Sequence, residues 1–318
     1  GLKREGVTHV AYEASSHGLD QYRAEGPRVA AGAFTNLSRD HLDYHGDMAA
    51  YFTAKLRLFS EVISDDGTAV IWADDDHAHR VVDLARERRL KLFRVGVAGE
   101  ELRIIERTPS QLGQTLSVEL DGKRHKLNLP LIGAYQAANA LMSAALVIAT
   151  GGEGAATLAN LSRLQPVRGR LERACITRSG APVYVDYAHT PDALEAAISA
   201  LRPHAEGKLV LVFGAGGDRD TGKRKEMGQI AARDADDVIV TDDNPRSEDP
   251  ARIRSMILEG APHAHEIAGR RAAIAEAVAA AGPADIVLLA GKGHEQGQII
   301  GDKVYPFDDV AVARECAA

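Results

Sequence analysis

The chain has 318 residues, of which 45% are hydrophobic and 26% charged, an ordinary composition for a globular protein with two domains. A net charge of −7 and the absence of Lys/Arg-rich runs argue against a nucleic-acid partner. No apolar run is long enough to span a bilayer, no signal peptide is found, and the two cysteines, Cys175 and Cys316, lack metal-ligand spacing. We therefore expect a cytoplasmic protein with no membrane partner.

Apolar strands alternate with helical patterns in the first half, which predicts an α/β fold with a mostly parallel sheet. The predicted strands are residues 8–12, 31–35, 68–72 and 91–95, and helices are predicted at 48–59 and 79–88. Residues 101–129 differ, because Asp121-Gly122 between two alternating runs predicts an antiparallel hairpin. An Ala-rich helix is predicted at 135–150, before Gly151-Gly152.

A second, Rossmann-like α/β unit follows a predicted linker at 164–170, which contains Pro166 and Gly169. Its predicted strands are 181–186, 208–213, 237–241 and 285–290. We therefore predict two domains, 1–163 and 164–318. Because residues 1–6 are typical of a helix tail that runs into a strand, we also expect the chain to begin inside a fold.

Asp243-Asn244-Pro245-Arg246 follows the apolar run 238–241 and is the most informative segment. Ligands of open α/β sheets bind outside the carboxyl ends of the strands. An amide and a guanidinium at such a position suit a ligand carboxylate, which Arg can bind as a bidentate fork. The alternative is an ordinary turn with a solvated arginine.

Polar residues also follow the predicted strands of the first unit. Glu13, Asn36 and His41 could face one crevice and hold Mg²⁺, which neutralises charge in phosphoryl transfer. Zinc is the rival metal because His41 and His45 have helical spacing, but a third ligand is missing. Lys55 lies in an amphipathic helix, where a solvent-facing lysine is the ordinary interpretation.

Two phosphate-binding motifs almost match in the second unit. Gly217 and Gly222-Lys223 have Walker A spacing, but Arg224 replaces the required Ser/Thr. The dinucleotide motif GxGxxG fails because Arg219 replaces its third glycine, which disfavours a Rossmann oxidoreductase.

Six segments taken together resemble the Mur ligases, in order and over nearly the whole chain. They are EASSHGL at 13–19, TNLSRDHLDYHG at 35–46, PVRGRLE at 166–172, DYAHTPD at 186–192, GDRD at 217–220 and GKGHE at 291–295. Mur ligases join an amino acid to a nucleotide-linked peptide in cytoplasmic peptidoglycan precursor synthesis. The resemblance implies that ATP phosphorylates a peptide carboxylate, that an amine attacks the acyl phosphate, and that the tetrahedral intermediate collapses to an amide.

The resemblance also implies residue roles. It implies UDP-dipeptide binding by Ser15, Gln21 and Arg23, and catalytic Mg²⁺ binding by Glu13 and His41 with carbamylated Lys55. For ATP it implies Asn139, Arg170, Asp186 and His189. For meso-diaminopimelate it implies Arg219, Asp243, Asn244, Pro245, Arg246, Gly291 and Glu295.

Diaminopimelate carries a distal carboxylate that lysine lacks, so Arg246 favours diaminopimelate over lysine as the amino acid added. The expected partners are therefore UDP-MurNAc-dipeptide, ATP and meso-diaminopimelate, bound by a monomer. A lysine-adding ligase is the nearest alternative.

One departure from the family is the lack of a GTNGKT-type P-loop, which no other GxxxxGK[ST] segment replaces. We expect a fragment of a ligase that cannot cleave ATP by itself, because the residues that organise the β- and γ-phosphates are missing. The alternative is a non-catalytic amino-acid-binding module.

Overall fold

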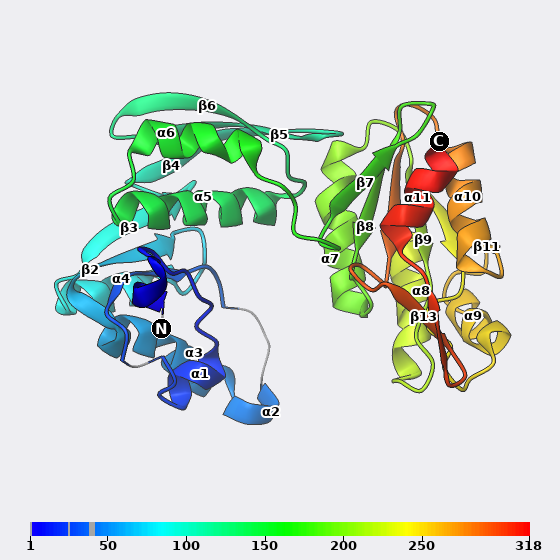
Figure 1. The fold of residues 1–318 in the computed structure, drawn as a ribbon, viewed down its shortest axis with the longest axis horizontal. Helices are drawn as coiled ribbons and strands as arrows, with labels where there is room; N and C mark the ends of the chain where they lie inside the picture. The colour runs from blue at the N-terminus through cyan, green and yellow to red at the C-terminus, as the bar shows by residue number, and fades with distance from the viewer. Residues whose placement is uncertain (1, 25, 38–41) are drawn as a thin grey trace. The chain divides into compact units, whose positions relative to one another are not determined.

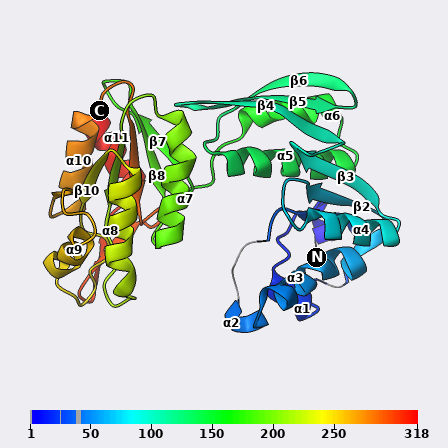
Figure 2. The ribbon, with the colours of Figure 1, turned by 180° about the vertical axis from the view of Figure 1, so that it is seen from behind.

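The computed structural model describes residues 2–24, 26–37 and 42–318. The chain forms two compact units (Figures 1 and 2). The first unit comprises Gly1–Glu106, Ser117–Leu127 and Ala138–Leu161, and the second comprises Arg107–Leu116, Asn128–Ala137 and Ser162–Ala318. No helix of the described ranges is both long and apolar enough to cross a membrane.

The first sheet has six strands in sequential order, and its first four run parallel. They are β1 (Val29–Phe34), β2 (Ile63–Trp72), β3 (Lys91–Gly96), β4 (Leu102–Ser110), β5 (Gly113–Leu120) and β6 (Lys123–Leu129). The predicted strands at 31–35, 68–72 and 91–95 are confirmed. The predicted hairpin is also confirmed, since Asp121 and Gly122 have φ of +51° and +71°, as a type I′ turn requires.

Helical segments accompany this sheet, and some of them share a hydrophobic core with it. They are η1 (Leu2–Glu5), α1 (Ser16–Asp20), α2 (Leu42–His45), α3 (Met48–Arg57), η2 (Leu58–Val62), α4 (Ala78–Glu87), α5 (Ala134–Ala149), α6 (Gly154–Asn160) and η3 (Leu161–Arg163). Phe52 and Phe59 pack against Phe34 and Ile71 of the strands, with Val81 of α4 in the same cluster. The predicted helices at 48–59, 79–88 and 135–150 are confirmed.

The predicted strand at 8–12 is wrong. Residues 7–15 belong to no helix or strand, and Val7, Val10 and Tyr12 are 39%, 60% and 49% exposed. An apolar run forms a strand only when a neighbour satisfies its backbone groups and covers one face. Here the apolar side chains bury no face, so the pattern alone does not produce a strand.

The second sheet has the order β11-β10-β9-β12-β8-β7, with all neighbours parallel except β7 and β8. Its strands are β7 (Glu172–Ile176), β8 (Pro182–Asp186), β9 (Leu209–Phe213), β10 (Asp237–Val240), β11 (His265–Glu266) and β12 (Ile286–Ala290). A separate antiparallel pair, β13 (Gly297–Ile300) and β14 (Lys303–Pro306), follows. The four strands predicted for this unit are confirmed.

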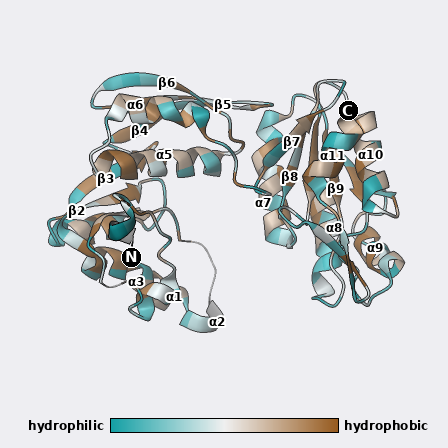
Figure 3. Ribbon diagram, viewed as in Figure 1, coloured by the Kyte–Doolittle hydropathy of each residue, from teal (hydrophilic) through white to brown (hydrophobic). Residues whose placement is uncertain are grey.

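Helices cover both faces of the second sheet. They are α7 (Pro191–Leu201), η4 (Arg202–His204), α8 (Gly222–Asp234), α9 (Pro250–Leu258), α10 (Arg270–Ala280) and α11 (Asp309–Ala317). Leu211 of β9 packs in a cluster with α7, α8 and α9, and its neighbour Val212 packs in a second cluster with α10 and α11. Successive strand residues thus face opposite helical layers, and Figure 3 shows the hydrophobic strands between amphipathic helices.

The strand order fixes where a ligand can bind. The chain passes from β8 to β9, continues outward through β10 and β11, and then returns to insert β12 between β9 and β8. In such doubly wound sheets the ligand crevice opens where the direction reverses, outside the strand carboxyl ends. The segments that follow β9, β10 and β12 meet at this position.

Candidate functional site

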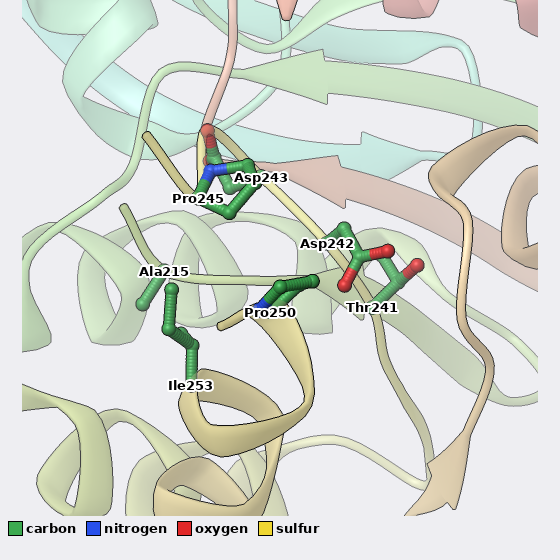
Figure 4. Close-up of a pocket in the computed structure, with 7 residues that line it drawn as sticks. All are labelled: Ala215, Thr241, Asp242, Asp243, Pro245, Pro250 and Ile253. Atoms are coloured by element: carbon green, nitrogen blue, oxygen red, sulfur yellow. The ribbon is translucent and has the colours of Figure 1, made fainter. Parts of the chain in front are cut away.

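The turn after β10 is packed against the carboxyl edge of the second sheet. Asp243 and Asn244 are 6% and 4% exposed. The hollow beside the turn, which Pro250 and Ile253 of α9 also line, is too narrow for a water molecule (Figure 4). Figure 4 shows Asp243 and Pro245 close together above this hollow. Such packing argues against an ordinary solvated turn.

Asp243 presents a buried carboxylate that lacks a hydrogen-bond donor among the described residues. The nearest cation is Lys292, whose Nζ lies 4.0 Å from Oδ1. Gly291 has a φ of +114° and passes so close that a Cβ would lie 2.6 Å from Oδ2. Burial raises the pKa of Asp243, although the charges of Arg270 and Lys292 oppose this. A buried acceptor without a donor is a suitable position for a ligand ammonium.

Lys292 lies close to three polar side chains of the site, those of Asp243, Asn244 and Glu295. It is fully buried, and its Nζ donates to Asn244 Oδ1 at 3.1 Å and to Glu295 Oε2 at 3.2 Å. Asn244 Nδ2 also donates to Glu295 Oε2, at 2.8 Å. The Ile299 N–H from β13 donates to Asn244 Oδ1 at 3.0 Å. These contacts fix the orientation of the Asn244 amide.

A second buried ion pair lies next to this network. Arg270 and Asp309 are 1% and 0% exposed and form two hydrogen bonds of 2.8 and 2.6 Å. Their charges cancel, so Asp243 and Glu295 share the single positive charge of Lys292. The buried network therefore carries one excess negative charge when all its carboxylates are ionised.

Arg246 places a half-buried guanidinium in the same loop. Its φ of +50° is rare for a residue with a side chain. Its backbone is held by β13 and the turn that follows, through Arg246 N–H to Ile299 O at 3.1 Å and Gly301 N–H to Arg246 O at 2.7 Å. Nη1 donates to Gly217 O at 2.8 Å. No described residue accepts a hydrogen bond from Nε or Nη2, so these groups can bind a carboxylate.

Two loops are tied together around Arg246. The Gly217 N–H donates to Asn244 O at 2.9 Å, and the Asp218 carboxylate accepts from Ser247 Oγ at 2.7 Å and from Ser247 N–H at 3.1 Å. A Cβ at Gly216 would lie 2.8 Å from Arg246 Nη1, so a larger residue here would displace the end of the Arg246 side chain. Arg219, which was predicted to bind diaminopimelate, is exposed in the loop that follows β9.

Arg224 and Glu248 complete this connection, and sequence reasoning missed the pair. Arg224 is fully buried, and its guanidinium donates to both Glu248 oxygens at 2.8 and 2.9 Å and to Gly216 O at 3.1 Å. Glu248 also accepts from the Asp218 N–H at 2.6 Å. The only sequence signal is the failed Walker A match, in which an arginine replaces a small hydroxyl residue.

The β8 edge brings together three of the residues predicted for ATP. Asp186 is 7% exposed and accepts from the Leu171 and Ala188 N–H groups at 2.8 and 2.9 Å. Burial raises its pKa, and these hydrogen bonds lower it. The Arg170 guanidinium lies 5.4 Å from the Tyr187 ring centre, and the His189 ring lies 4.6 Å from it.

His294 of the GKGHE segment faces the same aromatic ring, with 5.1 Å between ring centres. Tyr187 is therefore surrounded by an arginine and two histidines, a suitable surface for a planar or anionic ligand. Asn139, the fourth predicted ATP residue, lies on α5 in the first unit with its side chain exposed.

The predicted dipeptide residues lie around α1. Ser15 caps this helix, and its Oγ accepts from the Gly18 N–H at 3.1 Å. Gln21 Nε2 donates to the Tyr44 hydroxyl at 3.1 Å, and Tyr44 donates to Asp20 at 2.9 Å. Arg23 is exposed, and its Nη2 lies 3.9 Å from the position that a Cβ on Gly18 would occupy.

The structure describes only some of the residues that were predicted to bind a metal ion. His41 lies outside the described residues. Glu13 is exposed and forms no hydrogen bond or ion pair with a described residue. Lys55 is half-buried on α3, with Nζ 5.1 Å from the Tyr51 ring centre. His45, the rival zinc candidate, forms a hydrogen bond of 3.0 Å between its Nε2 and Ser16 Oγ.

Two family models match most of the chain. The Mur ligase middle domain matches residues 1–147, and the Mur ligase glutamate ligase domain matches residues 169–293. The two matches together include most of both structural units.

Curated relatives agree with these matches. A Zymomonas mobilis protein named UDP-N-acetylmuramoyl-L-alanyl-D-glutamate--2,6-diaminopimelate ligase is 60% identical over 99% of this chain and 65% of its own length. A Bradyrhizobium diazoefficiens protein of the same name is 55% identical over 97% of this chain and 64% of its own length. A solved structure described as a ligase of that name has a TM-score of 0.79 and 36% identity, over 99% of this chain and 65% of that one. The chain thus spans just under two thirds of these relatives.

Proposed function

Because the chain belongs to the Mur ligase family, we propose that it supplies the middle and C-terminal domains of an ATP-dependent amide ligase. The ligase adds meso-2,6-diaminopimelate to UDP-N-acetylmuramoyl-L-alanyl-D-glutamate in peptidoglycan precursor synthesis. ATP transfers its γ-phosphoryl group to the terminal carboxylate of the dipeptide. The amine of diaminopimelate attacks this acyl phosphate, and loss of phosphate and a proton leaves the amide.

The arrangement around Asp243 and Arg246 carries the proposal. The distal end of diaminopimelate has one ammonium and one carboxylate. The Asp243 carboxylate, without a donor of its own, and Glu295 suit the ammonium. The free Nε and Nη2 groups of Arg246 suit the carboxylate, which they can bind as a fork. Diaminopimelate would therefore satisfy the Asp243 carboxylate and the Nε and Nη2 groups of Arg246, which have no hydrogen-bond partner among the described residues.

Lysine is the second candidate for the amino acid added. It offers the same distal ammonium but no carboxylate, so it would leave the Arg246 guanidinium unpaired in a half-buried loop. Leaving such a charged donor unsatisfied costs about 1–3 kcal/mol. This difference supports diaminopimelate.

The remaining substrates have candidate positions of their own. Ser15, Gln21 and Arg23 are the proposed contacts of the UDP-dipeptide. For ATP, Arg170, Asp186 and His189, with Asn139, are the proposed contacts, and the rings around Tyr187 supply a surface for its planar and anionic parts.

Mg²⁺ would neutralise the charge on the transferring phosphoryl group. Glu13, His41 and the carbamate of a modified Lys55 are its proposed ligands, and their oxygen and imidazole donors suit the ion. Within the residues that the structure describes, no group of three or more His, Cys, Asp or Glu could hold a metal ion. The proposed set therefore depends on His41, which lies outside those residues.

Calorimetric titration of the 318-residue chain with meso-diaminopimelate and with L-lysine tests the proposal. We expect diaminopimelate to bind at least about 10-fold more tightly, as one charge-assisted fork implies. Equal affinities would contradict a role of Arg246 in selecting diaminopimelate, and tighter binding of lysine would favour the lysine-adding alternative. Binding of neither amino acid would contradict the assignment of this site.

A further inference from the structure

The Asn244 amide can act only as a donor toward a ligand. Lys292 Nζ and the Ile299 N–H converge on Oδ1, at 3.1 and 3.0 Å, and occupy both of its lone pairs. Nδ2 uses one of its hydrogens for Glu295 Oε2 at 2.8 Å. One N–H therefore remains for a ligand, and a carboxylate is the group that it suits.

Among the four charged groups Asp243, Glu295, Lys292 and Arg246, the charges balance only because Lys292 is present. The Arg270–Asp309 pair is neutral, so Asp243 and Glu295 are balanced by Lys292 from below and by Arg246 from the loop. The sum of these four charges is zero. The distal end of diaminopimelate is also neutral overall, with one ammonium and one carboxylate, whereas the distal end of lysine carries an unbalanced positive charge.

We propose that Lys292 determines the amino-acid specificity of this site. Its buried ammonium orients the Asn244 amide so that an N–H can donate to a ligand carboxylate, and it limits the negative charge of the site. A ligand ammonium must therefore be accompanied by a carboxylate. This inference rests on the proposed function. Lys292 acts through Asn244 and Glu295 and is a positioning residue, because its own hydrogen bonds are directed at protein atoms.

The test removes the ammonium and keeps the volume of the side chain. Lys292→Met has nearly the same length and a flexible apolar side chain that suits a buried position. The variant site has one excess negative charge, which repels a ligand carboxylate and attracts a lone ammonium. The matched control is Lys225→Met, because Lys225 is 57% exposed on α8 and, among the described residues, forms an ion pair only with Glu259, at 3.9 Å.

Calorimetric titrations with meso-diaminopimelate and L-lysine at neutral pH compare the three proteins. We expect Lys292→Met to bind diaminopimelate at least about 10-fold more weakly, as loss of one charge-assisted contact implies, and to bind lysine equally well or more tightly. The control should match the wild type. An equal loss for both amino acids would mean that Lys292 only maintains the fold and would overturn the inference, as would an unchanged preference.

A second variant covers the case in which Lys292→Met does not fold, which circular dichroism would detect. Asn244→Asp has nearly the same shape and replaces the NH₂ group with an oxygen, so that both the ligand-facing N–H and the N–H that donates to Glu295 are lost. It adds one negative charge while Lys292 stays in place. It should also shift the preference toward lysine, and an undiminished preference for diaminopimelate would overturn the inference. If the wild-type chain bound neither amino acid, the proposed function would fail together with the inference, whereas the outcomes above overturn the inference alone.

Discussion

Replacing Glu248 by glutamine tests the connection between the two loops that hold Arg246. The Glu248 carboxylate accepts two hydrogen bonds from fully buried Arg224 and a third from the Asp218 N–H. Glutamine keeps the shape, but its amide NH₂ replaces one acceptor and faces N–H donors. The Arg224 guanidinium also loses its counter-charge in a buried position.

The expected cost follows from these contacts. Removing one partner of a buried ion pair costs about 3–5 kcal/mol. The Glu248 side chain is 24% exposed, and glutamine retains one acceptor oxygen. We therefore expect the free energy of unfolding of the second unit to fall by about 2–3 kcal/mol at neutral pH.

The effect should depend on pH. The hydrogen bonds from Arg224 lower the pKa of Glu248 from 4.5 to about 2. A carboxyl group with a lowered pKa stabilises the folded state above its ordinary pKa, and this contribution is lost as the pH falls toward the folded-state value. The difference between wild type and Glu248→Gln should therefore narrow as the pH falls from 4.5 toward about 2.

Urea denaturation followed by circular dichroism measures this difference. Glu315→Gln is the matched control, because Glu315 and its partner Arg271 are 61% and 59% exposed, and such a pair contributes about 0–1 kcal/mol. A Glu248→Gln variant as stable as this control, or a loss independent of pH, would refute the reasoning.

Two further substitutions test the packing beneath the site. Gly291→Ala should lower the free energy of unfolding by about 2 kcal/mol or more and weaken amino-acid binding, because its Cβ would lie 2.6 Å from Asp243 Oδ2. The control Gly269→Ala, at a φ of +84° with no atom within 4 Å, should show only the smaller backbone cost in the same urea denaturation. Arg270→Met should cost about 3–5 kcal/mol in urea denaturation by leaving Asp309 buried and unpaired. Adding Asp309→Leu to Arg270→Met should restore part of this loss, and a double variant less stable than the single one would contradict the pairing.

The central strands of both sheets could be predicted because their apolar runs are short and bounded by turn residues, whereas the edge strands β7 and β11 were not predicted. The run 237–241 is an example, since it is followed at once by Asp-Asn-Pro. The run 8–12 is also rich in strand-forming residues but forms no strand, because a sequence pattern does not show whether a neighbouring strand is available. Local pattern therefore predicts strands only where the tertiary structure supplies a partner.

The polar residues of the site were predictable because they follow strands directly. Lys292 was not assigned a role, since a lysine between two glycines is typical of a solvated loop and its burial depends on residues 48 positions away. Arg224 and Glu248 were missed for the same reason, because 24 residues separate the two partners. The β13–β14 pair was also not predicted, although Gly301-Asp302 between two runs with β-branched residues is a local hairpin signal.

Affinity of an Arg246→Ala variant for the two amino acids is the measurement that tests the proposed specificity most directly. Arg246 offers its Nε and Nη2 groups to the distal carboxylate, which only diaminopimelate carries. Calorimetry should show about 10- to 100-fold weaker binding of meso-diaminopimelate and less than about 3-fold change for L-lysine. An equal loss for both amino acids, or a retained preference for diaminopimelate, would contradict the assignment of Arg246 as the group that binds the carboxylate.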